Sequence, residues 1–148
     1  MKLEIELVPQ TSFYNNVRSH VSTEEWDILR RECYQNASYK CEICGGIGDQ
    51  WPVECHEKWE YDDIKHIQKL TGFIALCPNC HKVKHFGRTQ LFGEEDLATS
   101  HFMKVNNLNK FEAKIEINKA IHIWEIRSQY NWILDINLLT TKLKKDSR

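Results

Sequence analysis

Alternating apolar and polar positions open the chain. The segment LEIELV (residues 3–8) alternates apolar with acidic side chains, which is the period of a half-buried strand. The period then changes, because Trp26, Leu29 and Cys33 recur at helical spacing behind a Ser-Thr capping sequence and an acidic first turn. We therefore expect a strand over residues 3–8 and a helix over residues 21–37.

The middle of the chain mixes turn residues with short apolar runs. Residues 40–59 contain Gly-Gly and Gly-Asp pairs, typical of turns, followed by a β-like stretch over residues 53–59, so we expect a hairpin there. Residues 64–77 predict a short helix or irregular segment that leads into an apolar run. PNCHKVKHF (residues 78–86) predicts a short helix.

The last third of the chain has a helical pattern. Residues 93–106 begin with acids and stop at an Asn-Asn pair, and residues 109–130 carry apolar side chains along one helical face. The basic tail over residues 138–148 is expected to fray. The chain contains no repeat and no low-complexity linker, so the pattern predicts one α+β domain over residues 1–148. Its parts are a strand and helix (1–36), a core (about 37–88) and helices (93–130).

Composition narrows the classes of function. The 148 residues carry a formal net charge of −1, so no global basic field indicates nucleic acid, although a local patch would suffice. The N-terminus MKLEIELVPQ has no apolar core of a signal peptide, and no apolar run reaches the length of a membrane span. We therefore expect a cytoplasmic protein without a membrane partner. In that setting six cysteines favour metal binding over disulfides.

Two Cys-x-x-Cys pairs are the strongest chemical signal. Cys41 and Cys44 form one pair, and Cys77 and Cys80 form the other. Each pair makes a tight turn that directs two thiolates to one point, and two such turns supply the tetrahedral sulfur environment that suits Zn²⁺. An iron–sulfur site would leave the neighbouring histidines unexplained. The sequence therefore predicts a structural zinc, with a structured insert between the pairs.

A second site is predicted directly after the zinc ligands. His81 and His85 are four residues apart, so they share one face of a helix and can chelate one ion. Cys80 and His81 are neighbours in the chain and project in different directions, so each can serve a different metal. A third ligand is available upstream in the segment ECHE, which contains His56.

These motifs resemble the HNH nuclease superfamily. The resemblance covers about residues 37–88 and rests on the first Cys-x-x-Cys, the strand that bears His56 and the segment ALCPNCHKVKH (residues 75–85). It implies a ββα-metal fold, in which two strands and a helix surround one divalent ion and a four-cysteine zinc braces the module. The helices outside this core would be additions to it.

The resemblance assigns His81 and His85 to the catalytic ion and leaves two alternatives for the first motif. In one, Cys55 fills the ligand position and His56 is the general base. In the other, His56 is the ligand and Glu57 is the base. Strand alternation favours the second alternative, and the near-neutral pKa of imidazole favours the first, so both stay open.

The mechanism that the resemblance implies is metal-dependent hydrolysis of a phosphodiester in DNA, ahead of RNA. Histidine ligands favour Mn²⁺, Ni²⁺ or Zn²⁺ as the ion, and the family resemblance also allows Mg²⁺. Lys82, Lys84 and Arg88 lie beside the predicted site and either contact phosphates or form a solvated helix face. Small chains of this type suggest a bacterial or phage origin.

Two departures from the family favour a second function. The middle Asn of the family would fall at Gly72, and the motif reads Cys-His-Glu. The alternative function is therefore a zinc-stabilised module on the same fold that binds nucleic acid or a protein partner without catalysis.

Overall fold

The computed structural model describes residues 1–146, so the last two residues of the expected domain lie outside the described residues. The fold is α+β with a three-stranded sheet, which confirms the predicted class. In chain order the elements are η1 (Gln10–Ser12), η2 (Val17–Ser19), α1 (Thr23–Asn36), β1 (Glu54–Asp62), β2 (Ile67–Leu76), α2 (Pro78–Lys84), α3 (Phe86–Leu91), α4 (Glu95–Asn106), α5 (Lys110–Arg127), β3 (Ile133–Asp135) and α6 (Leu138–Asp146).

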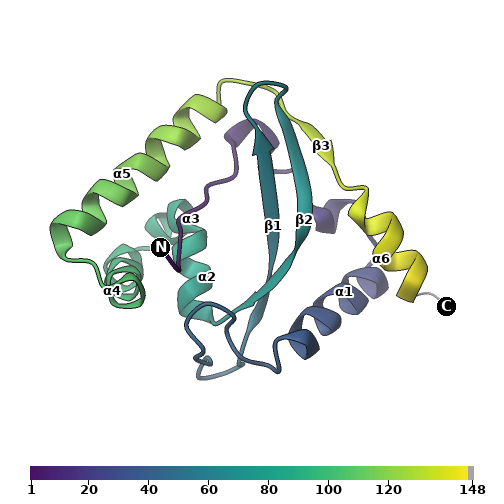
Figure 1. Cartoon of the computed structure of the whole chain (residues 1–148), viewed down its shortest axis with the longest axis horizontal. Coiled ribbons are helices and arrows are strands. Elements are labelled where there is room, and N and C mark those ends of the chain that lie inside the picture. The colour runs from purple at the N-terminus through teal and green to yellow at the C-terminus, as the bar shows by residue number, and fades with distance from the viewer. Residues whose placement is uncertain (147–148) are drawn as a thin grey trace.

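A long antiparallel hairpin of β1 and β2 runs through the centre of the molecule (Figure 1). Its register pairs Glu54 with Leu76 at one end and Asp62 with Ile67 at the other. The Asp62 carboxylate accepts hydrogen bonds from two backbone N–H groups of the turn, which is how short acidic side chains stabilise turns. The hairpin aligns the two strands that carry or support the histidine motif.

Two predictions for this region are wrong. Residues 64–77 were expected to be helical or irregular, but most of them form β2. Its apolar residues do not alternate in the sequence, because the polar Gln68 takes a buried position and Ala75 and Leu76 are both buried. The hairpin expected within residues 40–59 has a different turn. Its glycine-rich part forms a loop, and the strand that follows pairs with β2 instead.

The N-terminal segment is extended but forms no strand, so that prediction is also wrong. Its alternation is nevertheless real, since Leu3, Ile5 and Leu7 all pack on the core. The side chain of Asn106, at the end of α4, makes the backbone hydrogen bonds with Leu3 that a neighbouring strand would otherwise make. This side chain accepts from the Leu3 N–H at 3.0 Å and donates to the Leu3 carbonyl at 2.8 Å.

The predicted helix over residues 21–37 is confirmed as α1, and so is its capping box. Ser22 accepts from the Glu25 N–H at 3.1 Å, and the Glu25 carboxylate accepts from the Ser22 N–H at 2.9 Å. Residues 138–146 of the basic tail, expected to fray, instead form α6, which buries Leu139 against α1 and β2, and the rest of the tail lies outside the described residues. The strand β3 pairs in parallel with β2 and was not predicted.

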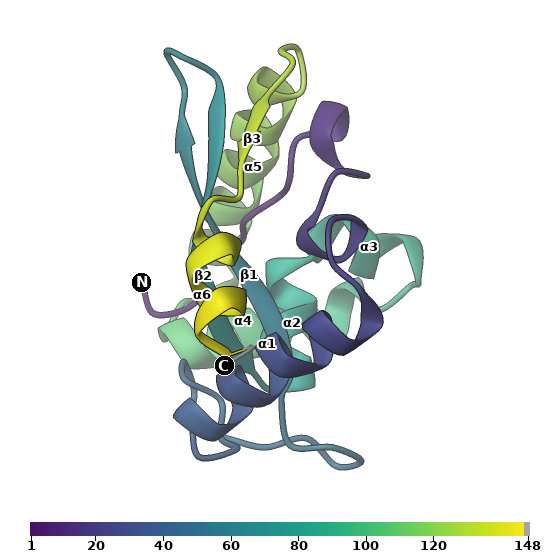
Figure 2. The same cartoon turned by 90° about the vertical axis from the view of Figure 1, so that its right-hand side faces the viewer.

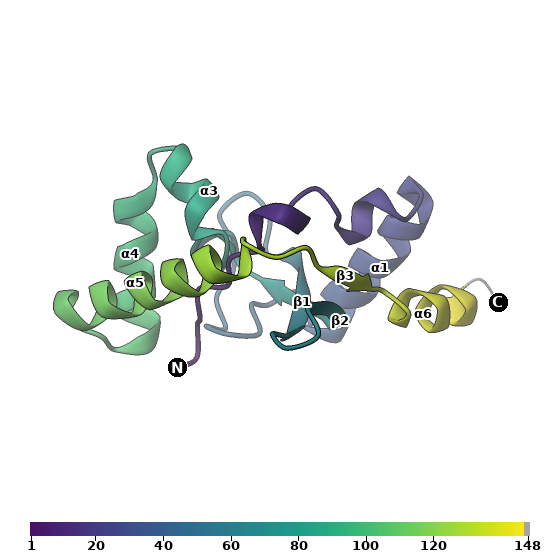
Figure 3. The ribbon, with the colours of Figure 1, turned by 90° about the horizontal axis from the view of Figure 1, so that it is seen from above.

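Helices cover the hairpin on both sides. In Figure 1, α2 to α5 lie on one side and α1 and α6 on the other, and the turned views in Figures 2 and 3 agree. One core cluster lies under α2 and α4 and includes Leu76, Val83 and Phe102. A second lies under α1 and α6 and includes Leu29 and Leu70. Within the described residues, no helix is both long and apolar enough to span a bilayer.

Candidate metal centres

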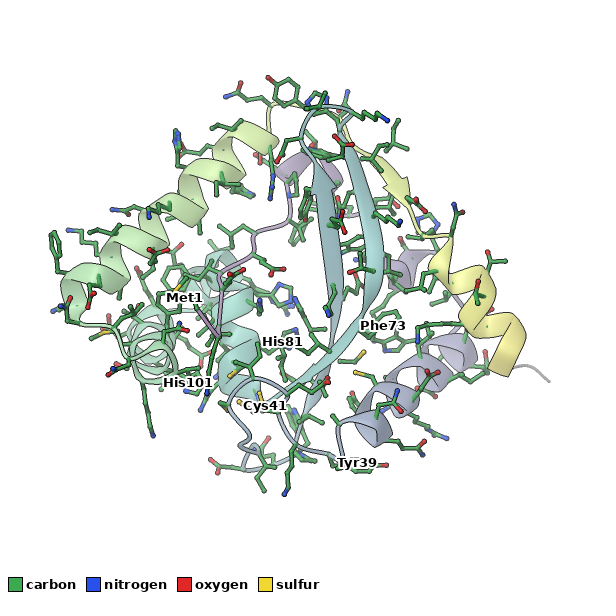
Figure 4. The ribbon with its side chains drawn as sticks, in the orientation of Figure 1. Met1, Tyr39, Cys41, Phe73, His81 and His101 are labelled. Carbon is green, nitrogen blue, oxygen red and sulfur yellow. The ribbon has the colours of Figure 1, made fainter. Side chains whose placement is uncertain are left out.

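The four predicted cysteines converge at the start of α2. Their sulfur atoms all lie within 4.8 Å of one another, and Cys44 Sγ is 3.6 Å from Cys77 Sγ. Tetrahedral Zn²⁺ with bonds of about 2.3 Å requires sulfur atoms about 3.8 Å apart. Figure 4 places Cys41 near the lower end of α2 in that view. The cluster can therefore hold a metal ion such as zinc.

Backbone N–H groups point at sulfur atoms in both Cys-x-x-Cys turns, which we call the two knuckles. Cys77 is the N-cap of α2, and its sulfur accepts from the Cys80 N–H at 3.4 Å. In the first knuckle Cys41 Sγ accepts from the Cys44 N–H at 3.5 Å, and Cys44 Sγ accepts from the Gly46 N–H at 3.4 Å. Hydrogen bonds of this kind stabilise thiolates, the form that binds metal.

The protonation states of the cluster favour a cation. A hydrogen bond from Cys80 lowers the pKa of Cys41 to about 4. Burial raises the pKa of Cys77 to about 11, and the hydrogen bond to Cys41 raises the pKa of Cys80 above its usual range. Without a cation, ionisation of Cys41 therefore opposes ionisation of its neighbours Cys77 and Cys80. A divalent ion supplies the positive charge that allows further thiols to ionise.

His101 adds a contact that the sequence did not reveal. It lies on α4, and its Nε2 is 3.1 Å from Cys80 Sγ (Figure 4 labels both His101 and Cys41). Because His101 is distant in sequence and belongs to no motif, only the packing of α4 on α2 brings it to the cluster.

The three predicted histidines also converge. The ring centroids of His56 and His81 are 5.2 Å apart, those of His56 and His85 are 5.0 Å apart, and those of His81 and His85 are 4.6 Å apart. One ring nitrogen from each lies within 4.8 Å of the others, which is close enough to share a single ion. This group contains none of the cysteines, as expected for a second site.

Strand and helix geometry explain the convergence. His56 projects from β1 toward α2, where it is 7% exposed. His81 and His85 lie one helical turn apart, and the His85 N–H donates to the His81 carbonyl at 3.1 Å, so both rings lie on one side of α2. In Figure 4 His81 lies between α2 and β1.

The environment keeps two of these rings neutral. Burial, with smaller contributions from the other two histidines, lowers the pKa of His56 to about 2. Burial and the neighbouring His81 lower the pKa of His85 to about 4. A neutral imidazole keeps a lone pair, so these rings are suited to bind a metal at neutral pH.

Glu54 is a site residue that the sequence did not identify. Its Oε1 lies 2.9 Å from His81 Nδ1, and its Oε2 accepts from Trp51 Nε1 at 3.1 Å. The hydrogen bond to His81 lowers the pKa of Glu54. The available signal was its position two residues before His56, because alternate residues of a strand share a face.

Two other residues of the first motif face away from the histidines. Cys55 packs with Cys33 of α1 in a separate core cluster. The carboxylate of Glu57 accepts from the Val17 N–H at 3.3 Å on the same far side of the sheet, and burial raises its pKa. Strand alternation directs both side chains away from the cluster, so this geometry does not favour Cys55 as a ligand or Glu57 as the base.

The three basic residues predicted as phosphate contacts have different surroundings. Lys84 does not fit that role, because it is 7% exposed and its Nζ lies 3.0 Å from Glu6 Oε1. Lys82 is partly exposed and pairs with Glu94 at 2.6 Å. Arg88 is exposed, with its guanidinium over the Phe92 ring at 5.5 Å. Only Lys82 and Arg88 remain available to an anion.

Gly72 lies on the same face of the hairpin as His56. It pairs with Lys58, and the neighbouring pair on that face is His56 with Ile74. A Cβ atom at Gly72 would meet no atom within 4 Å. This position would therefore accept a larger side chain.

Comparison of the chain with protein-family models, curated proteins and solved structures finds no match. Any function proposed for the two clusters therefore rests on their own geometry and chemistry.

Proposed function

We propose that the chain is a metal-dependent nuclease of the HNH type that hydrolyses phosphodiester bonds of DNA, with RNA as the second choice of substrate. The observation that carries the proposal is the convergence of His56, His81 and His85, whose ligand atoms lie within 4.8 Å of one another. They come from a strand of a β-hairpin and from the helix that follows it, the arrangement expected for a ββα-metal core.

The cysteine cluster is proposed to have a structural role and the histidine cluster a catalytic one. Four sulfur donors complete the tetrahedral coordination of Zn²⁺, so the cysteine cluster is proposed to hold a structural zinc that fixes the start of α2. Three nitrogen donors leave positions for substrate and water, as catalytic metal sites do. Imidazole ligands suit Mn²⁺, Ni²⁺ or Zn²⁺, and Mg²⁺ remains the ion that the family resemblance adds.

The chain's own residues take roles that follow from their positions at the histidine cluster. A divalent ion at the three histidines would lower the pKa of water and stabilise the charge on the phosphate and the leaving oxygen. His56 is assigned to the ion rather than to the base, because one of its ring nitrogens lies within 4.8 Å of those of His81 and His85 and burial keeps the ring neutral. Lys82 and Arg88 are proposed to orient the phosphate beside this site.

The second candidate function is a zinc-stabilised module that binds nucleic acid or a protein without catalysis. Two observations favour it. Glu57, the alternative base, faces the opposite side of the sheet, and Gly72 provides no side chain where the family places Asn. The absence of a base, and of the Asn side chain that the family has, would each reduce catalysis without affecting the fold.

Plasmid cleavage tests the proposal. Purified protein is incubated with supercoiled DNA in Mg²⁺, Mn²⁺, Ni²⁺ or EDTA, and nicked and linear products are quantified. We expect cleavage that requires a divalent ion, and a loss of at least about 10²-fold for His56→Ala because the ion loses a ligand. The matched control is His122→Ala, which removes an exposed histidine of α5 and should cleave like the wild type.

Zinc content and circular dichroism of each variant establish that the fold and the cysteine cluster are intact. If intact wild-type protein cleaves nothing with any of these ions but retards DNA or a protein partner in a binding assay, the second candidate function replaces the first.

A further inference from the structure

The carboxylate of Glu54 is held from two directions. Its Oε1 contacts His81 Nδ1 at 2.9 Å, and its Oε2 accepts a hydrogen bond from Trp51 Nε1 at 3.1 Å. The Glu54 side chain is 33% exposed and that of His81 is 22% exposed, so both are shielded from much of the solvent. The backbone of Glu54 is fixed as well, because it pairs with Leu76 in the hairpin.

This contact determines which nitrogen of His81 is free. An ionised carboxylate can only accept hydrogen bonds, so Nδ1 must carry the proton that lies between the two groups. The lone pair of the neutral ring is then on Nε2. His81 already lies within 5.2 Å of His56 and 4.6 Å of His85, measured between ring centroids, so its orientation decides whether three nitrogens meet.

We infer that Glu54 is a positioning residue for the histidine metal site: it selects the Nδ1–H tautomer of His81 and aims Nε2 at the ion. The inference rests on the proposed metal site and adds a fourth residue to it. Carboxylates that accept from metal-bound histidines raise the basicity of the ligand and fix its ring, and their loss typically weakens metal binding about 10–100-fold.

The structure also supplies a matched control. Glu94 forms an ion pair with Lys82, the neighbour of His81 in α2, at 2.6 Å and with a side-chain exposure of 42%. Replacing Glu94 with Gln removes a carboxylate that is as close to α2 but contacts none of the histidines. Any effect that Glu54 exerts only through helix stability or local charge should appear in this variant too.

The test measures metal affinity and the tautomer separately. Wild type, Glu54→Ala, Glu54→Gln and Glu94→Gln are prepared with zinc in the cysteine cluster, verified by one zinc per chain, and titrated with Ni²⁺ by calorimetry. We expect binding about 10–100-fold weaker in Glu54→Ala, a smaller loss in Glu54→Gln, which keeps an acceptor oxygen, and no change in Glu94→Gln. Before Ni²⁺ is added, ¹⁵N spectra of the histidine rings should show the Nδ1–H tautomer of His81 in the wild type and its loss in Glu54→Ala.

The outcomes separate this inference from the proposed function. If the wild type binds no Ni²⁺, the histidine site itself is refuted and the inference with it. If the wild type binds Ni²⁺ but Glu54→Ala keeps the same affinity and the same His81 tautomer, the site stands and the role of Glu54 is refuted. Should Glu54→Ala fail to fold, the isosteric Glu54→Gln decides by the same two measurements.

Discussion

The cysteine and histidine clusters are joined by one peptide bond, between Cys80 and His81, yet they depend on the fold in different ways. The cysteines come from a loop and from the start of α2, and residues 45–76 separate the two pairs. The histidines come from β1 and α2, which the hairpin and the core already hold together. A metal at the cysteines would therefore add a link between that loop and α2, beyond the core contacts that Cys41, Cys77 and Cys80 already make, whereas β1 and α2 are held by the hairpin and the core.

The number of donors separates the clusters further. Four sulfurs saturate a tetrahedral ion, and three of the four cysteines are buried. Three nitrogens do not saturate an ion, and only His56 of the three histidines is buried. Adjacent residues of one short helix would thus serve a closed centre and an open one if both clusters bind metal, because successive helical side chains point in different directions.

The largest expected effect is the loss of one cysteine ligand. Cys77→Ser should abolish zinc binding and destabilise the fold by more than about 5 kcal/mol, since binding of a structural zinc is coupled to folding. Zinc content, solubility and thermal unfolding measure this. Cys33→Ser is the matched control, because Cys33 is buried but belongs to neither cluster. It should cost about 1–2 kcal/mol and retain the zinc. A folded, zinc-free Cys77→Ser protein would contradict the comparison.

Acid should affect the histidine cluster next. The pKa of His56 is about 2 in the folded protein, against about 6.5 for an unperturbed histidine. Below pH 6.5 the unfolded chain therefore binds more protons, and stability falls as the pH falls. At pH 5 the loss from His56 alone is about 2 kcal/mol, from 1.5 pH units at about 1.4 kcal/mol each.

Urea unfolding between pH 7.5 and pH 5 tests this, with zinc retained and no second ion added. His56→Gln should reduce the pH dependence, whereas His122→Gln, at an exposed position of α5, should not. Equal pH dependence in the two variants would show that His56 is not held neutral by the fold.

The sequence predicted most of the residues of the two candidate clusters and less of the fold around them. Ligand spacing is local, so Cys41, Cys44, Cys77, Cys80 and the histidine pair could be identified without tertiary information. The capping box of α1 is local for the same reason. In contrast, the apolar residues of β2 have no clear period because Gln68 takes a buried position, and within the described residues the three residues of β3 pair only with β2. A short strand of this kind carries no signal of its own.

The orientation of side chains was harder to predict than their identity. The Cys55-His56-Glu57 motif fits two assignments in sequence, and only the contacts of these side chains in the fold show which of them faces α2. Glu54 was overlooked because a single glutamate at the end of a strand is common on protein surfaces. Its role depends on the His81 ring, which lies on another element.

A smaller effect is expected at Glu57, and it tests whether the far face of β1 takes no part in the histidine cluster. Burial raises the pKa of Glu57, so the folded protein favours the protonated form, and this contribution to stability is lost as the pH rises through the folded pKa. Glu57→Gln should therefore be stabilising by about 1 kcal/mol at pH 7 and neutral near pH 4. It should leave cleavage unchanged, because Glu57 lies on the far face of the sheet. A severe loss of cleavage would restore Glu57 as the base.

The smallest expected effect on stability comes from Gly72→Asn, which tests the family resemblance directly. Gly72 has extended backbone within β2 and an empty Cβ position, so Asn should fit and change stability by less than about 1 kcal/mol. The new side chain would project from the same face as His56, where the family places its Asn. If the HNH assignment is right, Mn²⁺-dependent plasmid cleavage should rise several-fold above the wild type. Lys69→Asn introduces the same residue at an exposed position of β2 and should leave cleavage unchanged. A stable Gly72→Asn protein with unaltered cleavage would mean that this position does not correspond to the family Asn. The alignment of this sequence with the HNH motif would then be contradicted at that position.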